Sequence, residues 1–142
     1  MSALQSGPLR GPPSLIRFAG YAAVWDRVDR AGDVMRRGAF ADAGPVPLLW
    51  QHRGRATGVI EVLAEDARGL RVEGAVSDPE LAALVRQGAV AGLSVGYRAL
   101  AARQGARREV IRAALAEVSL VAVPMQPLAR VERVLAAGIT PA

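Results

Sequence analysis

Apolar and polar residues alternate along several stretches of this chain, which is the pattern of β-strands with one buried face. The stretches that predict strands are 15–25, 46–52, 57–63, 69–76, 93–100 and 131–135, and the stretch 108–123 predicts one or two more. A four-residue turn, Glu65-Asp66-Ala67-Arg68, separates two of them and predicts a hairpin. The stretch 46–52 ends in His52 and is expected to stop there as a strand.

One segment follows helical spacing instead. Ser77 or Asp78 is suited to cap a helix, Pro79 is tolerated at its first position, and Glu80 complements its positive end. Apolar residues then recur from Leu81 at intervals of three and four. This helix is predicted to lie directly before the strand that begins near residue 93.

Together these elements predict a mainly β domain, an antiparallel β-barrel surrounded by a few helices, over residues 15–135. The regular strand–helix alternation of a doubly wound fold is missing. Residues 1–14 are rich in Gly and Pro and are expected to be a flexible lead-in, and residues 136–142 a loose tail. A length of 142 residues suits one such domain.

The amino-acid composition excludes several kinds of functional site. The chain has no cysteine, which excludes disulfides and cysteine-based metal sites, and its single histidine argues against a zinc site. We therefore expect no metal and no cofactor. No apolar run reaches the roughly 18 residues of a membrane span. Residues 1–13 also lack the apolar core of a secretory signal.

The net charge is +5, and all 18 basic residues are arginine. Uniform use of arginine points to a GC-rich coding bias, and solvated surface arginines explain the charge without a nucleic-acid partner. No block of arginines is interleaved with aromatic residues, as a nucleic-acid surface would favour. A DNA-binding function therefore ranks last among the alternatives.

Two residues are candidates for chemistry: His52, the only histidine, and Ser94, within Gly92-Leu93-Ser94-Val95-Gly96. Histidine is the usual general base for a serine hydroxyl near neutral pH. The Gly-x-Ser-x-Gly string matches the nucleophile elbow of α/β-hydrolases, but that motif needs a strand before the serine and a histidine after it. Here a helix precedes Ser94 and His52 comes earlier, so we reject the elbow.

Each candidate also has an ordinary structural explanation. His52 can be a satisfied histidine at a strand end, and Ser94 a small residue in a glycine-rich strand. A base histidine usually has an orienting partner, and Glu117 is the acid that stands out. It opens an apolar strand and shares a face with Ser119, Val121 and Val123, either at a solvent edge or held for a purpose.

Several blocks in the same order resemble the HK97-type phage prohead proteases, the serine proteases of capsid maturation. They are Gly20-Tyr21-Ala22-Ala23-Val24-Trp25-Asp26 with Asp33 and Gly38-Ala39-Phe40; Leu48-Leu49-Trp50-Gln51-His52 with Gly58-Val59; Gly69-Leu70-Arg71-Val72-Glu73-Gly74; Gly92-Leu93-Ser94-Val95-Gly96-Tyr97; and Glu117-Val118-Ser119-Leu120-Val121 with Pro124, Pro127 and Ala129-Arg130-Val131. The resemblance extends over roughly residues 15–133. The segment between Phe40 and Val46 and the helix from Asp78 to Gly88 are short beside that pattern. A chain this compact fits a mature product, a truncated relative or a gene-transfer-agent version.

The resemblance implies a serine endopeptidase with a fold like the herpesvirus assemblins. It implies Ser94 as nucleophile, His52 as general base and Glu117 as third member, where the herpesvirus relatives use a second histidine. The loop around Met125-Gln126 is the candidate source of oxyanion-stabilising N–H groups.

The resemblance also implies a biological setting. The implied substrate is scaffold or the scaffolding segment of the major capsid protein, cut inside the procapsid in the bacterial cytoplasm and followed by self-cleavage. A homodimer is compatible with it. The rival class is a non-catalytic β-barrel module that binds partners or has a structural place in the capsid.

Overall fold

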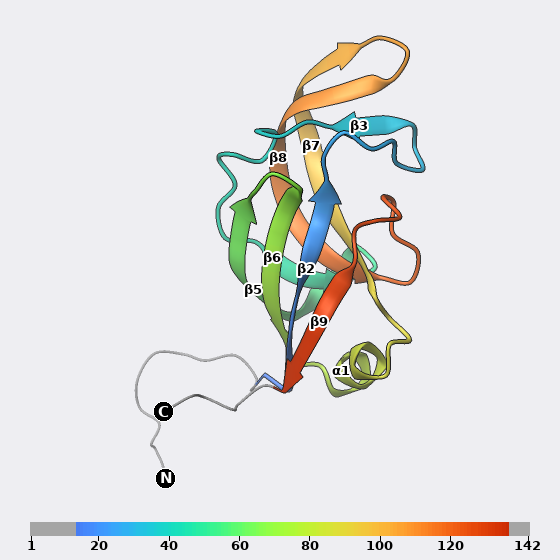
Figure 1. Ribbon diagram of the computed structural model, residues 1–142. Coiled ribbons are helices and arrows are strands. Elements are labelled where there is room, and N and C mark those ends of the chain that lie inside the picture. Colours follow the sequence, from blue (N-terminus) through green and yellow to red (C-terminus); the bar gives the residue numbers. More distant parts are fainter. Residues whose placement is uncertain (1–13, 137–142) are drawn as a thin grey trace.

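The computed structural model describes residues 14–136 and arranges them around a single β-sheet scaffold (Figure 1). In chain order the elements are β2 (Ile16–Val24), β3 (Asp33–Met35), β4 (Pro47–Trp50), β5 (Arg53–Glu65), β6 (Gly69–Val76), α1 (Pro79–Arg86), β7 (Gly92–Gln104), β8 (Arg108–Val121) and β9 (Val131–Ala136). The predicted strands are confirmed, and the stretch 108–123 holds one long strand, which ends at Val121. The predicted lead-in and tail lie outside the described residues, apart from Ser14 and Ala136.

All eight strands belong to one sheet, with the hydrogen-bonded order β3-β8-β4-β5-β6-β2-β9. The strand β7 pairs with β8 along nearly its whole length, so β3 and β4 share the other edge of β8. Both of these pairings are parallel, whereas the remaining ones are antiparallel. The strand β8 therefore lies between β7 on one side and β4 on the other.

The sheet is open, so the expectation of a closed antiparallel barrel is wrong. Between β7 and β9 the described residues form one isolated bridge, Gly92 with Arg130, supported by the bonds Leu93 N–H to Ala129 O and Val131 N–H to Ala91 O. Beyond this point β7 follows β8 and β9 follows β2. The two strands diverge, and no continuous ladder closes the sheet.

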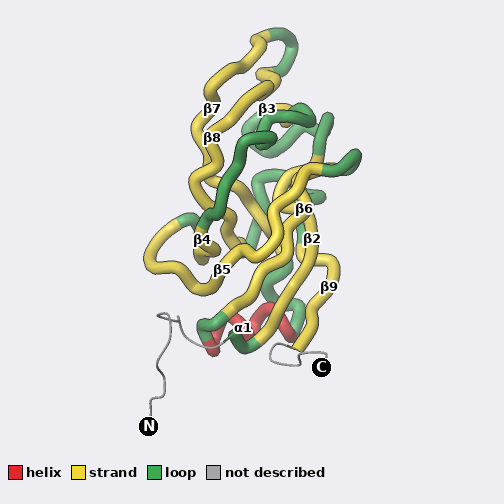
Figure 2. The backbone as a smooth tube through the Cα atoms, turned by 90° about the vertical axis from the view of Figure 1, so that its left-hand side faces the viewer, coloured by secondary structure: helices red, strands yellow, loops and turns green. Residues whose placement is uncertain are grey.

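A few helices were expected around the strands, and the described part of the chain contains one, α1. It lies at one end of the sheet (Figures 1 and 2). The carboxylate of Asp78 caps it by accepting the Leu81 N–H at 2.9 Å, and Pro79 begins it, both as predicted. Across residues 14–136, no helix has the length and apolar character needed to cross a membrane.

The core fills the space enclosed by the curved sheet. The largest fully buried apolar side chains come from most of the long strands: Ile16, Phe18, Leu48, Leu70, Val72, Val76, Leu93, Val110, Val118 and Leu120. The outer half of the β7–β8 hairpin extends past the rest of the sheet (Figures 1 and 2). The inner half contributes to the core and carries Ser94 and Glu117.

Leu48→Ala tests how far the fold depends on β4. Leu48 has no exposed surface and pairs with both Gly58 and Val118. Its truncation is expected to lower the free energy of unfolding by about 2–5 kcal/mol, because the cavity cannot collapse between two paired strands. Val59→Ala is the control, since Val59 is 54% exposed and its truncation is expected to cost under about 0.5 kcal/mol. Equal urea midpoints for the two variants would contradict this account of β4.

Candidate active site

His52 lies in the two-residue turn that joins β4 to β5. Trp50 pairs with Arg53, and the intervening Gln51 and His52 have φ angles of 55° and 63°. Positive φ at both central residues is the pattern of a type I′ turn, which normally contains Asn or Gly. Holding two larger side chains in this region costs on the order of 1–3 kcal/mol each.

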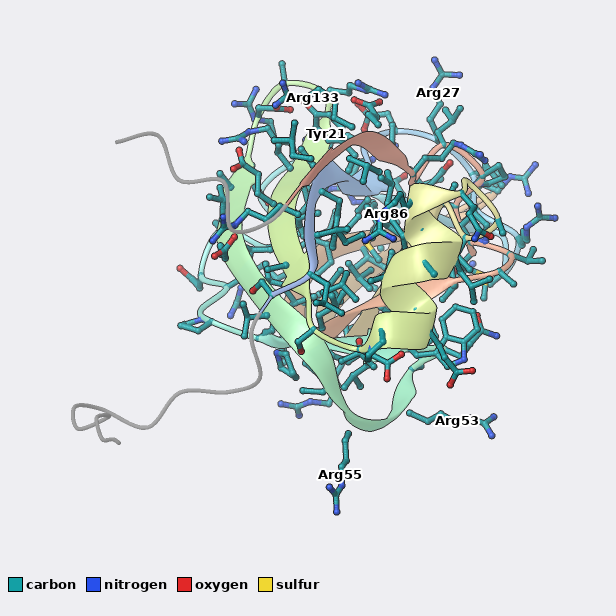
Figure 3. All side chains as sticks on the ribbon, turned by 90° about the horizontal axis from the view of Figure 1, so that it is seen from below. Tyr21, Arg27, Arg53, Arg55, Arg86 and Arg133 are labelled. Carbon is teal, nitrogen blue, oxygen red and sulfur yellow. The ribbon has the colours of Figure 1, made fainter. Side chains whose placement is uncertain are left out.

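Hydrogen bonds to β8 and to the residue after it hold this unfavourable turn in place. The Gln51 N–H donates to the Leu120 carbonyl at 3.0 Å, and the Gln51 side-chain oxygen accepts the Ala122 N–H at 2.7 Å. The His52 N–H donates to Ser119 Oγ at 3.0 Å. The turn is therefore fixed against β8 at three points. On its outer side, Arg53 and Arg55 extend into solvent (Figure 3).

Glu117 contacts the imidazole ring of His52. Its Oε2 lies 2.6 Å from His52 Nδ1, and its Oε1 accepts a hydrogen bond from Ser119 Oγ at 2.7 Å. Glu117 is only 9% exposed, so of the two explanations open at the sequence level the solvent edge is wrong. An ionised carboxylate only accepts hydrogen bonds, so Nδ1 carries the proton in this pair and Nε2 is left as the basic nitrogen.

Ser94 lies on β7, the strand next to Glu117. In the β7–β8 register, Ser94 is opposite Ser119 and Gly96 is opposite Glu117. Paired residues of an antiparallel ladder point to the same face, so Ser94, Ser119 and Glu117 share one side of the sheet. Ser94 is buried, at 5% exposure. Among residues 14–136 no hydrogen bond joins its hydroxyl to His52.

The two glycines that flank Ser94 are required by close neighbours. A Cβ at Gly96 would lie 2.0 Å from Glu117 Oε2, and a Cβ at Gly92 would lie 2.8 Å from both Pro124 Cδ and the Val121 carbonyl oxygen. Side chains at either position would collide with these atoms. The glycines therefore allow the Glu117 carboxylate and the loop after β8 to pack against the segment of β7 that carries Ser94.

A small surface pocket borders Ser94. Met125 and Gln126, from the loop after β8, form part of its wall. Arg30 anchors this loop: its N–H donates to the Met125 carbonyl at 2.8 Å and its Nε to the Pro124 carbonyl at 2.9 Å. The loop that the sequence singled out for oxyanion stabilisation thus lies beside the candidate nucleophile.

Tyr97 forms another part of the pocket wall, together with Asp29 and Asp33. Burial raises the pKa of Tyr97, and the negative charges of Asp33 and Asp29 raise it further. Both effects favour the protonated phenol at neutral pH.

The arrangement contains the parts needed for general-base activation of a hydroxyl. A carboxylate holds one imidazole nitrogen, the other nitrogen makes no hydrogen bond to residues 14–136, and a serine lies on the same face as the carboxylate one strand away. No group of three or more His, Cys, Asp or Glu side chains within the described residues is placed to hold a metal ion.

The structure brings His52 and Glu117 into contact and places Ser94 on the strand beside them. Sequence analysis left Ser119 out of the candidate site, although it makes hydrogen bonds to both His52 and Glu117. The available signal was the shared strand face, since Ser119 is two residues after Glu117. The signal was insufficient because the contact with the His52 turn depends on the parallel pairing of β4 with β8.

Comparison with known proteins identifies relatives. A family model described as caudovirus prohead serine protease matches residues 12–140. The prohead protease of Enterobacteria phage HK97 is 34% identical over 92 residues, which cover 56% of this chain and 41% of that protein. The chain therefore aligns with about two fifths of the length of this relative.

Two solved structures share the fold. The capsid assembly protease of bacteriophage T4 has a TM-score of 0.58 at 15% identity, covering 74% of this chain and 80% of that one. The KSHV protease, in complex with a hexapeptide phosphonate inhibitor, has a TM-score of 0.55 at 16% identity, covering 79% and 61% of the two chains. The expected likeness to a herpesvirus protease fold is confirmed.

Gly96→Ala tests the contact between Glu117 and His52. The new Cβ would overlap Glu117 Oε2, so the carboxylate is expected to move away from Nδ1, at a cost of about 1–3 kcal/mol in stability. Because His52 is the only histidine, its ring gives one set of ¹⁵N-correlated NMR signals. The downfield Hδ1 signal is expected in the parent and lost in the variant. Gly105→Ala, whose nearest neighbour atom is 3.9 Å away, is the control. An unchanged Hδ1 signal in Gly96→Ala would disprove the contact.

Proposed function

The chain belongs to the family of caudovirus prohead serine proteases, and on that premise we propose that it is a serine endopeptidase of capsid maturation. The observation that carries the proposal is the 2.6 Å contact between His52 Nδ1 and Glu117 Oε2, on the sheet face that also carries Ser94. A buried carboxylate that orients the only histidine beside a buried serine has a direct use in acyl transfer.

In this mechanism Ser94 Oγ attacks the scissile carbonyl while His52 Nε2 takes its proton. The imidazolium then gives that proton to the leaving amine. Glu117 keeps Nδ1 protonated, orients the ring and stabilises its positive charge. In the second half of the reaction water is the nucleophile: His52 Nε2 takes its proton as the water oxygen attacks the acyl carbonyl. The proton then returns to Ser94 Oγ, and the acyl group leaves as a carboxylic acid. The bond from Ser94 to His52 forms when substrate binds, as catalytic hydrogen bonds often tighten only in the complex.

Backbone N–H groups of the loop after β8 are the candidate oxyanion hole. Met125 and Gln126 line the pocket next to Ser94, and Arg30 fixes the loop through two of its carbonyls. A loop held in this way supplies donors that need little reorganisation as negative charge develops.

The proposed substrate is scaffold or the scaffolding segment of a major capsid protein, and self-cleavage follows. Support comes from the HK97 relative, which is a prohead protease, and the T4 neighbour, which is a capsid assembly protease. The enzyme would act inside the procapsid of a phage or a gene transfer agent, in the host cytoplasm. Removal of internal protein makes room for DNA. A homodimer is compatible with this role.

Ser94→Ala and His52→Asn test the proposal together. Each removes one reacting group, and Asn tolerates the positive φ of residue 52, so the turn is retained. Each variant is expected to lose about 10⁴-fold or more in the rate of capsid-precursor cleavage, followed by gel electrophoresis. Ser77→Ala, whose hydroxyl bonds only to the Thr57 carbonyl among the described residues, is the matched control. Normal processing by Ser94→Ala would refute the protease assignment and favour a non-catalytic module.

Glu117→Gln tests the proposed role of Glu117 as the group that orients the His52 imidazole. The amide has nearly the same shape, but it can present its NH₂ group to the His52 ring and so stabilise the wrong tautomer. We expect the cleavage rate to fall by about 10³–10⁴-fold while the far-UV circular dichroism spectrum remains unchanged. A rate within threefold of the parent would remove Glu117 from the catalytic set and leave His52 without its proposed partner.

A further inference from the structure

Ser119 is a buried serine for which the proposed mechanism has no use. It has no exposed surface, lies opposite Ser94 on β8 and is two residues from Glu117. Its hydroxyl contacts two of the three candidate site residues: the His52 N–H at 3.0 Å and Glu117 Oε1 at 2.7 Å. A hydroxyl in this position has consequences for the geometry of both neighbours.

The direction of each hydrogen bond follows from the chemistry of the groups. The backbone N–H of His52 only donates, so Ser119 Oγ accepts there. An ionised carboxylate only accepts, so the single hydroxyl proton of Ser119 goes to Glu117 Oε1. The second carboxylate oxygen, Oε2, is then left for His52 Nδ1. The result is a closed ring of three hydrogen bonds that begins at the backbone of His52 and returns to its imidazole.

This ring restrains the two features on which the orientation of His52 depends. One is the turn with positive φ at Gln51 and His52, which needs bonds from β8 to remain in place. The other is the rotation of the Glu117 carboxylate, which must present Oε2 to Nδ1. Ser119 is not a second nucleophile, because its proton and an acceptor lone pair are already engaged and no solvent reaches it.

We propose that Ser119 is a positioning residue of the protease site, whose hydroxyl aligns the Glu117 carboxylate and the backbone of His52 so that the imidazole faces Ser94. The inference rests on the proposed function, and it adds a fourth group to the three already assigned. Removal of the hydroxyl leaves the His52 N–H without its acceptor and frees the carboxylate to rotate.

Ser119→Ala is the direct test, because it deletes the hydroxyl and adds no atoms to the core. We expect kcat to fall about 10–100-fold with KM changed less than threefold, since substrate contacts are not involved. The Hδ1 NMR signal of His52 is expected to broaden or move upfield, a change that a serine with only a structural role would not produce. Ser77→Ala is expected to leave kcat, KM and the Hδ1 signal unchanged.

A double-mutant cycle separates an effect on the alignment of the Glu117 carboxylate from a general disturbance of the site. In the Glu117→Gln background the carboxylate is already absent and only the bond from the His52 N–H remains to be lost, so we expect Ser119→Ala to lower the rate by a clearly smaller factor than it does in the parent. An undiminished 10–100-fold loss in that background would mean that Ser119 does not act through the Glu117 carboxylate and would overturn the proposal. Parent values of kcat and Hδ1 in the single variant would overturn it as well.

Failure of this inference is distinguishable from failure of the proposed function. If Ser94→Ala abolishes cleavage and Ser119→Ala leaves both rate and Hδ1 signal unchanged, the protease stands and the positioning role falls. If Ser94→Ala cleaves normally, the proposed function falls, and the positioning of a catalytic base falls with it. Circular dichroism on each variant establishes that the comparison is made between folded proteins.

Discussion

The contact between His52 and Glu117 is the interaction on which the rest of the candidate site depends. It joins a turn at the surface to a buried position in the middle of β8. That turn adopts a backbone conformation that its own residues disfavour, so its geometry must be imposed by the strand beside it. Because three hydrogen bonds from the turn reach β8 and the residue after it, the sheet supplies that constraint.

The order of the strands explains why the site lies where it does. β8 is flanked by β7, which carries Ser94, and by β4, which leads into His52, so the candidate nucleophile and base reach it from opposite edges. Glu117 and Ser119 project between them. The glycines around Ser94 then let the carboxylate and the loop containing Met125 come close. The open sheet therefore positions these residues without closing into a barrel.

The strands and the start of the helix were predictable from local sequence, whereas the pairing of distant strands and the place of Ser119 were not. Alternation of apolar residues located the strands, and Asp78 with Pro79 marked the helix start, because these signals act within a few residues. The open sheet and the place of Ser119 depend instead on which strands pair across long separations. The parallel register of β4 with β8 joins residues about 70 positions apart, and no local pattern encodes it. The positive φ of Gln51 and His52 runs against local preference, so it was also beyond prediction.

The central claim is that His52, oriented by Glu117, activates Ser94. The most direct measurement is reaction of the protein with a fluorophosphonate, which phosphonylates activated serines, followed by mass spectrometry of the peptides. We expect one adduct, on Ser94, formed quickly in the parent and at least about 100-fold more slowly in His52→Asn. An adduct on another serine, or labelling of Ser94 at the same rate without His52, would contradict the account.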